Sequence, residues 1–156
     1  MSGAVADGAP HSKQSLRLWL RLLRCSTAIE KRARTMLIDR FDTTLPRFDV
    51  MSALDRAPEG LTMGELSNQL LVSNGNVTPI VSRLVDDGLI TRTQDRNDRR
   101  ILRAKLTARG RRDFRAMAGE HEKWIEHLLG DIPDDEIHPL LAGLDRVKAS
   151  VERNGP

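Results

Sequence analysis

The feature that most constrains this chain is a change in the spacing of its apolar residues near residue 89. Before this point, apolar residues recur every three or four positions, which is typical of amphipathic helices. After Leu89 the helical spacing stops, and Leu102, Ala104 and Leu106 follow a spacing of two, which is typical of a strand. Helical spacing returns after Thr107. The sequence therefore predicts a mainly α protein with one β-hairpin between two sets of helices.

The boundaries of the first helices follow from capping signals. A first helix is expected from residue 12 to about residue 39, since this stretch contains neither proline nor glycine. A second begins at Leu45-Pro46, because proline is tolerated in a first turn. Thr62 and Glu65 have the spacing of a capping box, in which each side chain caps the other's backbone N–H, so a third helix begins there.

The next segment contains a second short helix and the hairpin. Ser73 is a good N-cap for the fourth helix, which ends where Asp87-Gly88 provides a C-terminal cap. Strands are expected at 89–93 and 101–106, joined by a charged turn at 94–100. The second strand would place Leu102, Ala104 and Leu106 on one face, and Arg103 and Lys105 on the other. Thr107 then caps a long helix, and Pro133 separates it from a last one.

Charge is distributed unevenly along the chain, although the net charge is only +3. Residues 11–47 and 73–115 each sum to +6, whereas residues 48–72 sum to −3 and residues 116–156 to −5. Twenty of the 25 basic residues are arginine, which favours bidentate contacts with phosphate and guanine. A basic middle segment is the electrostatic footprint expected for a polyanionic partner.

Composition excludes several other classes. The 156 residues are 39% hydrophobic, enough for a folded core, and no apolar run approaches the roughly 18 residues of a membrane span. We expect a cytoplasmic protein without a secretory signal. Cys25 follows the apolar stripe of the first helix and is expected to be a buried small hydrophobe. The four histidines have no metal-site spacing, so neither a metal nor a cofactor is expected, and no catalytic constellation is present.

A helix, a short turn, a second helix and a charged hairpin form a helix-turn-helix with a wing. The major groove of B-DNA admits one α-helix, whose leading end needs short polar side chains. The hairpin turn carries three arginines, and arginine is attracted to narrow minor grooves. The residues expected to contact DNA are Ser73, Asn74, Gly75, Asn76, Thr78, Pro79 and Arg83 in the helix, and Arg96, Arg99 and Arg100 in the wing.

Residues 61–110 resemble the winged helix-turn-helix of the MarR family of transcriptional regulators. The resemblance lies in the segments Leu61–Leu66, Val72–Thr78 and Leu84–Ile90, and most specifically in the wing Asp95–Arg100 and the Leu106-Thr107-x-x-Gly110 that follows it. It implies that Asp98 positions the wing through an ion pair and that Arg100 enters the minor groove. It further implies that Arg96 and Arg99 flank Arg100 on phosphates.

The resemblance also implies the organisation of the molecule. It makes residues 12–152 a single domain. Residues 1–11 are expected from their small and polar composition to be a disordered tail. Within that domain, 45–110 would be the winged helix-turn-helix lobe, and 12–40 and 111–152 would be dimerisation helices. The expected protein is not an enzyme but a homodimeric repressor. It would bind pseudo-palindromic duplex DNA and be released by a small effector, aromatic in many members of the family.

Pro79 departs from a regular recognition helix. Six residues into a helix that begins near Ser73, it removes the N–H that would bond to the Gly75 carbonyl and should strain the helix. Two interpretations remain open: the helix is kinked at Pro79, or it begins later, near Asn76. Pro79 is also the one feature that favours an alternative function, a winged-helix module that contacts proteins and has lost DNA binding.

Overall fold

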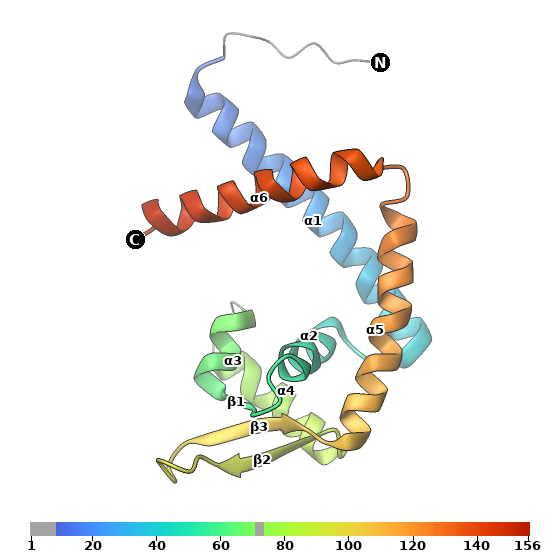
Figure 1. Cartoon of the computed structure of the whole chain (residues 1–156), viewed down its shortest axis with the longest axis vertical. Coiled ribbons are helices and arrows are strands. Elements are labelled where there is room, and N and C mark those ends of the chain that lie inside the picture. The colour runs from blue at the N-terminus through green and yellow to red at the C-terminus, as the bar shows by residue number, and fades with distance from the viewer. Residues whose placement is uncertain (1–8, 71–73) are drawn as a thin grey trace. The chain divides into compact units, whose positions relative to one another are not determined.

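The computed structural model describes residues 9–70 and 74–156. The elements in chain order are α1 (His11–Phe41), α2 (Leu45–Asp55), β1 (Leu61–Thr62), α3 (Met63–Leu70), α4 (Asn74–Asp86), β2 (Ile90–Gln94), β3 (Leu102–Leu106), α5 (Ala108–Leu128) and α6 (Asp134–Asn154) (Figure 1). The predicted mainly α fold with a wing hairpin is confirmed. Helix α1 begins at His11, one residue earlier than expected, and the predicted tail lies outside the described residues as far as residue 8.

The chain divides into two compact units. The first ends at Ala118 and contains α1 to α4, the sheet and the first half of α5. The second, Gly119–Pro156, contains the rest of α5 and the whole of α6. The helix-turn-helix and the wing therefore lie together in the first unit.

The sheet has three antiparallel strands in the order β1-β3-β2. The hairpin pairs Ile90 with Leu106 at one end and Gln94 with Leu102 at the other, so both strands lie within a residue of their predicted bounds. Strand β1 was not predicted, because its two residues are too few to show a period of two. It pairs only Leu61 with Ala104 and Thr62 with Arg103.

Capping interactions fix the helix ends as the sequence indicates. The Thr62 N–H donates to Glu65 Oε2 at 2.9 Å, and the Glu65 N–H donates to Thr62 Oγ1 at 3.1 Å, which completes the capping box of α3. Thr107 Oγ1 accepts the N–H of Gly110 at 2.9 Å at the start of α5. Gly88 adopts a φ of +74°, the left-handed conformation that ends α4.

The core of the first unit lies between α2, α3, α4, the sheet and the adjoining ends of α1 and α5. Its fully buried large side chains are Leu37, Val50, Met51, Leu54, Leu66, Val77, Val81, Leu84 and Ile90. Phe48 and Phe114 add a tilted ring contact between α2 and α5, with centroids 5.4 Å apart. Because α4 contributes three of these residues, its rotation about its own axis is fixed by packing.

Large apolar side chains are exposed on α1 and α6. They include Leu16, Trp19, Leu20 and Leu23 on α1, and Ile137, Leu140, Leu141, Leu144 and Val151 on α6. The prediction that Cys25 is buried is wrong for this chain: Cys25 is exposed, since α1 buries only Ala33, Met36 and Leu37. In the described part of the chain, no helix combines the length and the apolar character that a membrane crossing requires.

Candidate nucleic-acid interface

Helix α4 has one face in the core and another in solvent. Val77, Val81 and Leu84 are completely buried, whereas Gly75, Asn76, Thr78, Pro79 and Arg83 are exposed. Five of the predicted contact residues thus lie on the solvent side of one helix. Ser73 is outside the described residues, and of Asn74 only the backbone position, at the start of α4, is described.

The helix runs through Pro79 without interruption from Asn74 to Asp86. The interpretation in which α4 begins near Asn76 is therefore wrong, and Pro79 lies in the helix interior. The missing N–H leaves the Gly75 carbonyl without its helical partner. Gly75 is exposed, so water can satisfy this carbonyl.

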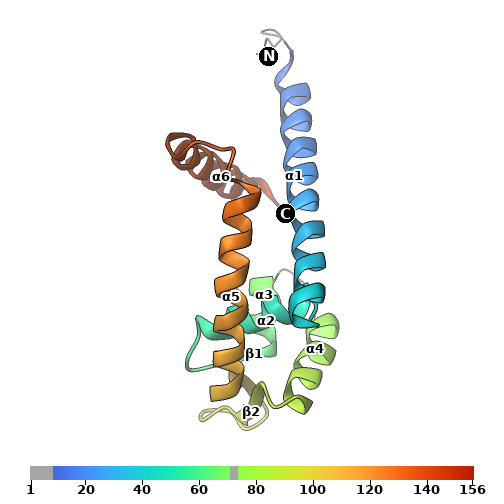
Figure 2. The same ribbon diagram turned by 90° about the vertical axis from the view of Figure 1, so that its right-hand side faces the viewer.

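Two contacts hold the C-terminal end of α4, which leads directly into β2 (Figure 2). The Leu89 N–H donates to the Leu84 carbonyl at 2.9 Å, across the turn formed by Gly88. Arg47 of α2 donates to Asp87 Oδ2 at 2.5 Å. No spacing rule predicts this pair, because the two residues are 40 positions apart in the chain.

Asp95 organises the wing turn. Its Oδ2 accepts the N–H of Asn97 at 3.0 Å and that of Asp98 at 3.2 Å. Its own N–H donates to the Ile101 carbonyl at 2.8 Å, which closes the turn at its base. Asp95 thus acts as an Asx-turn residue, a role that needs the short carboxylate at the first position of the turn.

Asp98 holds Arg100 by three hydrogen bonds. Asp98 Oδ1 accepts the backbone N–H of Arg100 at 3.0 Å and its Nε–H at 3.1 Å, and Oδ2 accepts from Nη2 at 3.1 Å. The Arg100 side chain remains 90% exposed. The geometry fits the expected ion pair of Asp98 and presents an oriented guanidinium to solvent. Arg96 and Arg99 are exposed in the same turn.

One further arginine of the hairpin, Arg103, was not among the predicted functional residues. Arg103 Nε donates to Asp95 Oδ1 at 2.5 Å, and its Nη1 lies 3.6 Å from Glu65 Oε2. The alternation of β3 predicted only that Arg103 faces away from Leu106. Its contact with Glu65 could not be predicted, because the pairing of β3 with β1 was not visible in the sequence.

These contacts change the acidity of the wing. The side-chain hydrogen bond from Arg103, together with the backbone N–H groups of Asn97 and Asp98, lowers the pKa of Asp95 below its ordinary value of 3.8. The side-chain and backbone hydrogen bonds from Arg100 lower the pKa of Asp98 in the same way. Asp95 in turn raises the pKa of Arg103. Both carboxylates therefore remain charged at neutral pH.

We expect the two carboxyls to respond to different arginines. In a carbon-detected NMR titration, both should protonate below pH 3.8. A lowered pKa means that the native contacts stabilise the charged form, so this stabilisation is present above the ordinary pKa and disappears as pH falls through the native pKa. Arg103→Met should raise the midpoint of Asp95 and leave that of Asp98 nearly unchanged. Arg100→Ala should raise the midpoint of Asp98 and leave that of Asp95 nearly unchanged. Equal shifts of both midpoints in both variants would contradict the pairing of each carboxyl with its own arginine.

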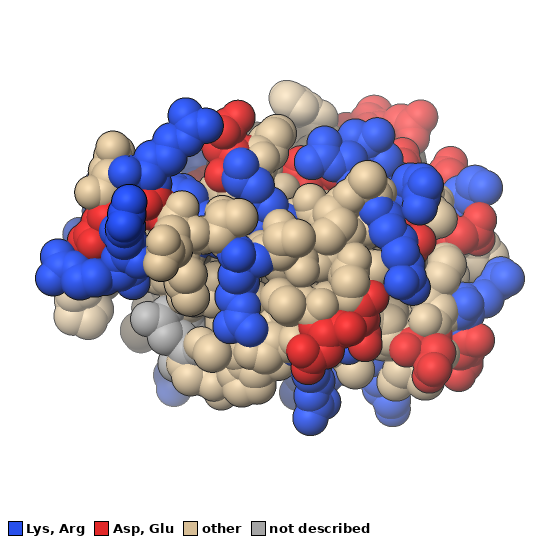
Figure 3. Space-filling model, turned by 90° about the horizontal axis from the view of Figure 1, so that it is seen from below, with Lys and Arg blue, Asp and Glu red and all other residues tan. Residues whose placement is uncertain are grey.

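Basic side chains are prominent on the side of the molecule that carries the sheet. Figure 3 shows lysines and arginines spread across this face, with acidic side chains between them. Among the residues that the structure describes, no group of three or more histidine, cysteine or acidic side chains is placed to hold a metal ion.

Comparison with known proteins gives a consistent result. Residues 41–101 match the MarR family. The chain is 29% identical over 153 residues to the transcriptional activatory protein BadR of Rhodopseudomonas palustris, covering 92% of this chain and 87% of BadR. A MarR family transcriptional regulator from Silicibacter pomeroyi has 31% identity and a TM-score of 0.78, over 92% of this chain and 99% of that structure. Streptococcus pneumoniae FabT, solved in complex with DNA, shares the fold at 24% identity, with a TM-score of 0.72 over 89% of this chain and 98% of FabT.

The structural match to the Silicibacter pomeroyi regulator extends along nearly the whole of both chains and includes the helices on both sides of the winged helix-turn-helix. The chain therefore belongs to the MarR family of DNA-binding transcriptional regulators.

Proposed function

We propose that this protein is a homodimer that represses transcription by binding pseudo-palindromic duplex DNA, and that a small organic effector releases it. The observation that carries the proposal is the pair of exposed elements in one compact unit: the outer face of α4 and a wing with Arg100 held by Asp98. A helix suits the major groove, and an oriented arginine suits the narrower minor groove. FabT, which has this fold, is described as a complex with DNA.

In the proposed complex, the residues of α4 and of the wing have different roles. Asn76 and Thr78 would contact base edges, since asparagine can pair with adenine through two hydrogen bonds. Gly75 would let the backbone approach DNA closely, and the polar side chains of Asn74 and of Ser73, which precedes it in the sequence, would add contacts to DNA. Arg83 would contact a phosphate or a guanine. Arg96 and Arg99 would contact phosphates on either side of Arg100.

The first test is binding of the intact protein to the DNA upstream of its own gene, measured by fluorescence anisotropy at several salt concentrations. We expect Arg100→Ala to weaken binding by about 1–3 kcal/mol and to lower the salt dependence by about one counterion. Arg153→Ala, at the far end of α6, is the control and should change neither. Equal binding of the upstream duplex and of a scrambled duplex would rule out specific recognition.

Dimerisation is proposed from the exposed apolar faces of α1 and α6. Helix α6 has 21 residues and an apolar stripe, yet none of its residues is buried within the chain. Amphipathic helices normally bury such a stripe, and large exposed apolar patches mark interaction surfaces. A second copy is the partner we propose, since two-fold symmetry would also present two α4 helices to two DNA half-sites.

An effector site is proposed in a cavity of about 540 Å³ beside α4. Its apolar lining comes from Leu45, Pro46, Leu70, Val77 and Ile80, and its polar lining from Glu30, Arg34, Asp49 and Asn76. This volume is in the range of small-molecule sites. Asn76 lines this cavity and is also proposed to contact base edges. A ligand bound in the cavity would therefore compete with the binding of DNA by α4.

The direction of regulation is tested separately. BadR is named as an activator, whereas we propose repression for this chain. A promoter–reporter assay with and without the gene distinguishes the two, because a repressor lowers and an activator raises expression. The alternative, a protein-binding module without DNA contacts, was favoured by Pro79 alone. Since α4 continues through Pro79, this observation no longer supports the alternative.

A further inference from the structure

The backbone connection between the wing and the helix-turn-helix is short. Strand β1, which leads directly into α3, pairs with β3 at two positions only. The outer strand β2 pairs with β3. A ladder of two residue pairs fixes an angle poorly, since few hydrogen bonds resist twisting. Burial of Ile90, Ala104 and Leu106 holds the base of the hairpin in the core, so a further contact would act on the part of the hairpin nearer the turn.

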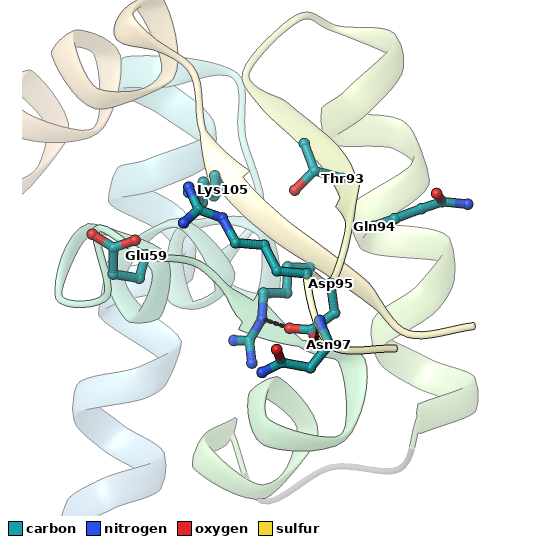
Figure 4. A pocket seen from close by; sticks show the side chains of 8 residues that line it. Glu59, Thr93, Gln94, Asp95, Asn97 and Lys105 are labelled. Atoms are coloured by element: carbon teal, nitrogen blue, oxygen red, sulfur yellow. Dashed lines mark hydrogen bonds and ion pairs between the residues drawn. The ribbon is translucent and has the colours of Figure 1, made fainter. Parts of the chain in front are cut away.

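Arg103 lies at this connection. It is the β3 residue opposite Thr62 of β1 and Thr93 of β2. Its guanidinium donates to Asp95 on the wing side, and its Nη1 donates to the Gly60 carbonyl at 3.4 Å and lies near Glu65 on the helix side. Figure 4 shows the hydrogen bond to Asp95 at the edge of a cavity of about 340 Å³. The Arg103 side chain therefore contacts both the wing and the segment that leads into the helix-turn-helix.

Two partners of Arg103, Asp95 and Glu65, each hold a local element of the structure in place. Asp95 accepts the N–H groups that form the wing turn, and Glu65 accepts the Thr62 N–H that caps α3. The network is also partly shielded, with 12% of the Asp95 side chain and 32% of the Arg103 side chain exposed. Isolated ion pairs on a protein surface contribute little to stability, but networks of ion pairs with a fixed geometry contribute more.

We propose that Arg103 is a positioning residue that fixes the wing relative to the helix-turn-helix, so that Arg100 and α4 engage DNA together. This inference rests on the proposed DNA-binding function. Arg103 would not itself contact DNA, since its guanidinium is occupied by Asp95, Glu65 and Gly60. Its effect would reach DNA through Arg100, although the contacts of Arg103 described above are made to other residues.

A double-mutant cycle tests this coupling in the intact protein. We expect Arg103→Met to weaken binding of the upstream duplex about tenfold or more. Arg100→Ala should weaken binding about five- to 150-fold in the wild type, but less than about threefold in the Arg103→Met background. Lys105→Met is the matched control, because it removes one positive charge from the same face of β3. Arg100→Ala should retain its full effect in that background.

Asp95→Asn separates positioning from simple electrostatics. Removing a negative charge near DNA should tighten binding if only charge matters. The amide can still accept the turn N–H groups but makes no ion pair with Arg103, so positioning predicts weaker binding, by about fivefold. Tighter binding of Asp95→Asn, or an undiminished effect of Arg100→Ala in the Arg103→Met protein, would overturn the proposal. Urea unfolding of each variant verifies that it is folded.

A measurement without DNA distinguishes this proposal from the proposed function. In NMR relaxation of the free protein, Arg103→Met should increase backbone motion of residues 95–101, whereas Lys105→Met should not. Increased motion in a protein that binds no DNA would support the anchoring role and refute the DNA-binding function. Unchanged motion in the Arg103→Met protein would refute the anchoring role, whatever the affinity for DNA.

Discussion

Replacing Gly110 with alanine should destabilise the protein by about 3 kcal/mol, although alanine is the better helix former. A Cβ at this position would lie 2.0 Å from the Leu89 carbonyl oxygen and 2.9 Å from its carbon. That carbonyl cannot move freely, because it accepts the Thr107 N–H at 3.0 Å, and the Leu89 N–H is bonded to Leu84. The start of α5 would therefore have to move away from the sheet.

Gly119→Ala is the matched control for this change, because it lies in the same helix with nothing within 4 Å of the added Cβ. It should stabilise the protein by about 1 kcal/mol through helix propensity alone. Urea unfolding followed by circular dichroism, at one fixed protein concentration, measures both effects. Gly110→Ala with the same stability as the wild type would show that the contact with Leu89 relaxes without cost.

Introducing two charges on α6, as Leu140→Asp with Leu144→Asp, should abolish self-association at micromolar concentration. The two side chains are 52% and 47% exposed in the single chain, so folding of the chain itself should be preserved. Burying two carboxylates in an apolar dimer interface should raise its dissociation constant at least about a thousandfold, or about 4 kcal/mol. Sedimentation velocity measures the assembly state directly.

Arg146→Asp provides the control for charge. It changes the net charge by the same amount and lies on α6 away from the apolar stripe, so the protein should remain dimeric. A wild-type protein that sediments as a monomer would refute the proposed dimer. A double variant that still sediments as a dimer would show that α6 does not form the interface.

Much of the helix-turn-helix could be predicted because its signals are local. Capping of α3 by Thr62 and Glu65 involves residues three positions apart, and the burial of Val77 and Leu84 follows from helical spacing. The exposed turn of the wing likewise follows from its polar sequence. The family resemblance then added roles for individual arginines.

What the sequence did not predict depends on contacts between distant segments. The ion pairs Arg47–Asp87 and Arg103–Glu65 span about 40 residues each, and no spacing rule connects such positions. Strand β1 is recognised only through its partner β3. The exposure of Cys25 has a similar cause: helical spacing places Cys25 on the apolar stripe of α1, but this helix buries only Ala33, Met36 and Leu37 in the described chain.

The pairing of Asp98 with Arg100 has a consequence for how quickly the proposed regulator finds its site. Asp98 offsets part of the positive charge that Arg100 would otherwise present to any duplex, so Arg100 adds less to sequence-independent attraction than an unpaired arginine would. A genome offers a vast excess of competing positions, and time spent on them delays arrival at the operator. A guanidinium that is paired but oriented therefore shortens the time spent at each nonspecific position. It can still enter the minor groove of the operator.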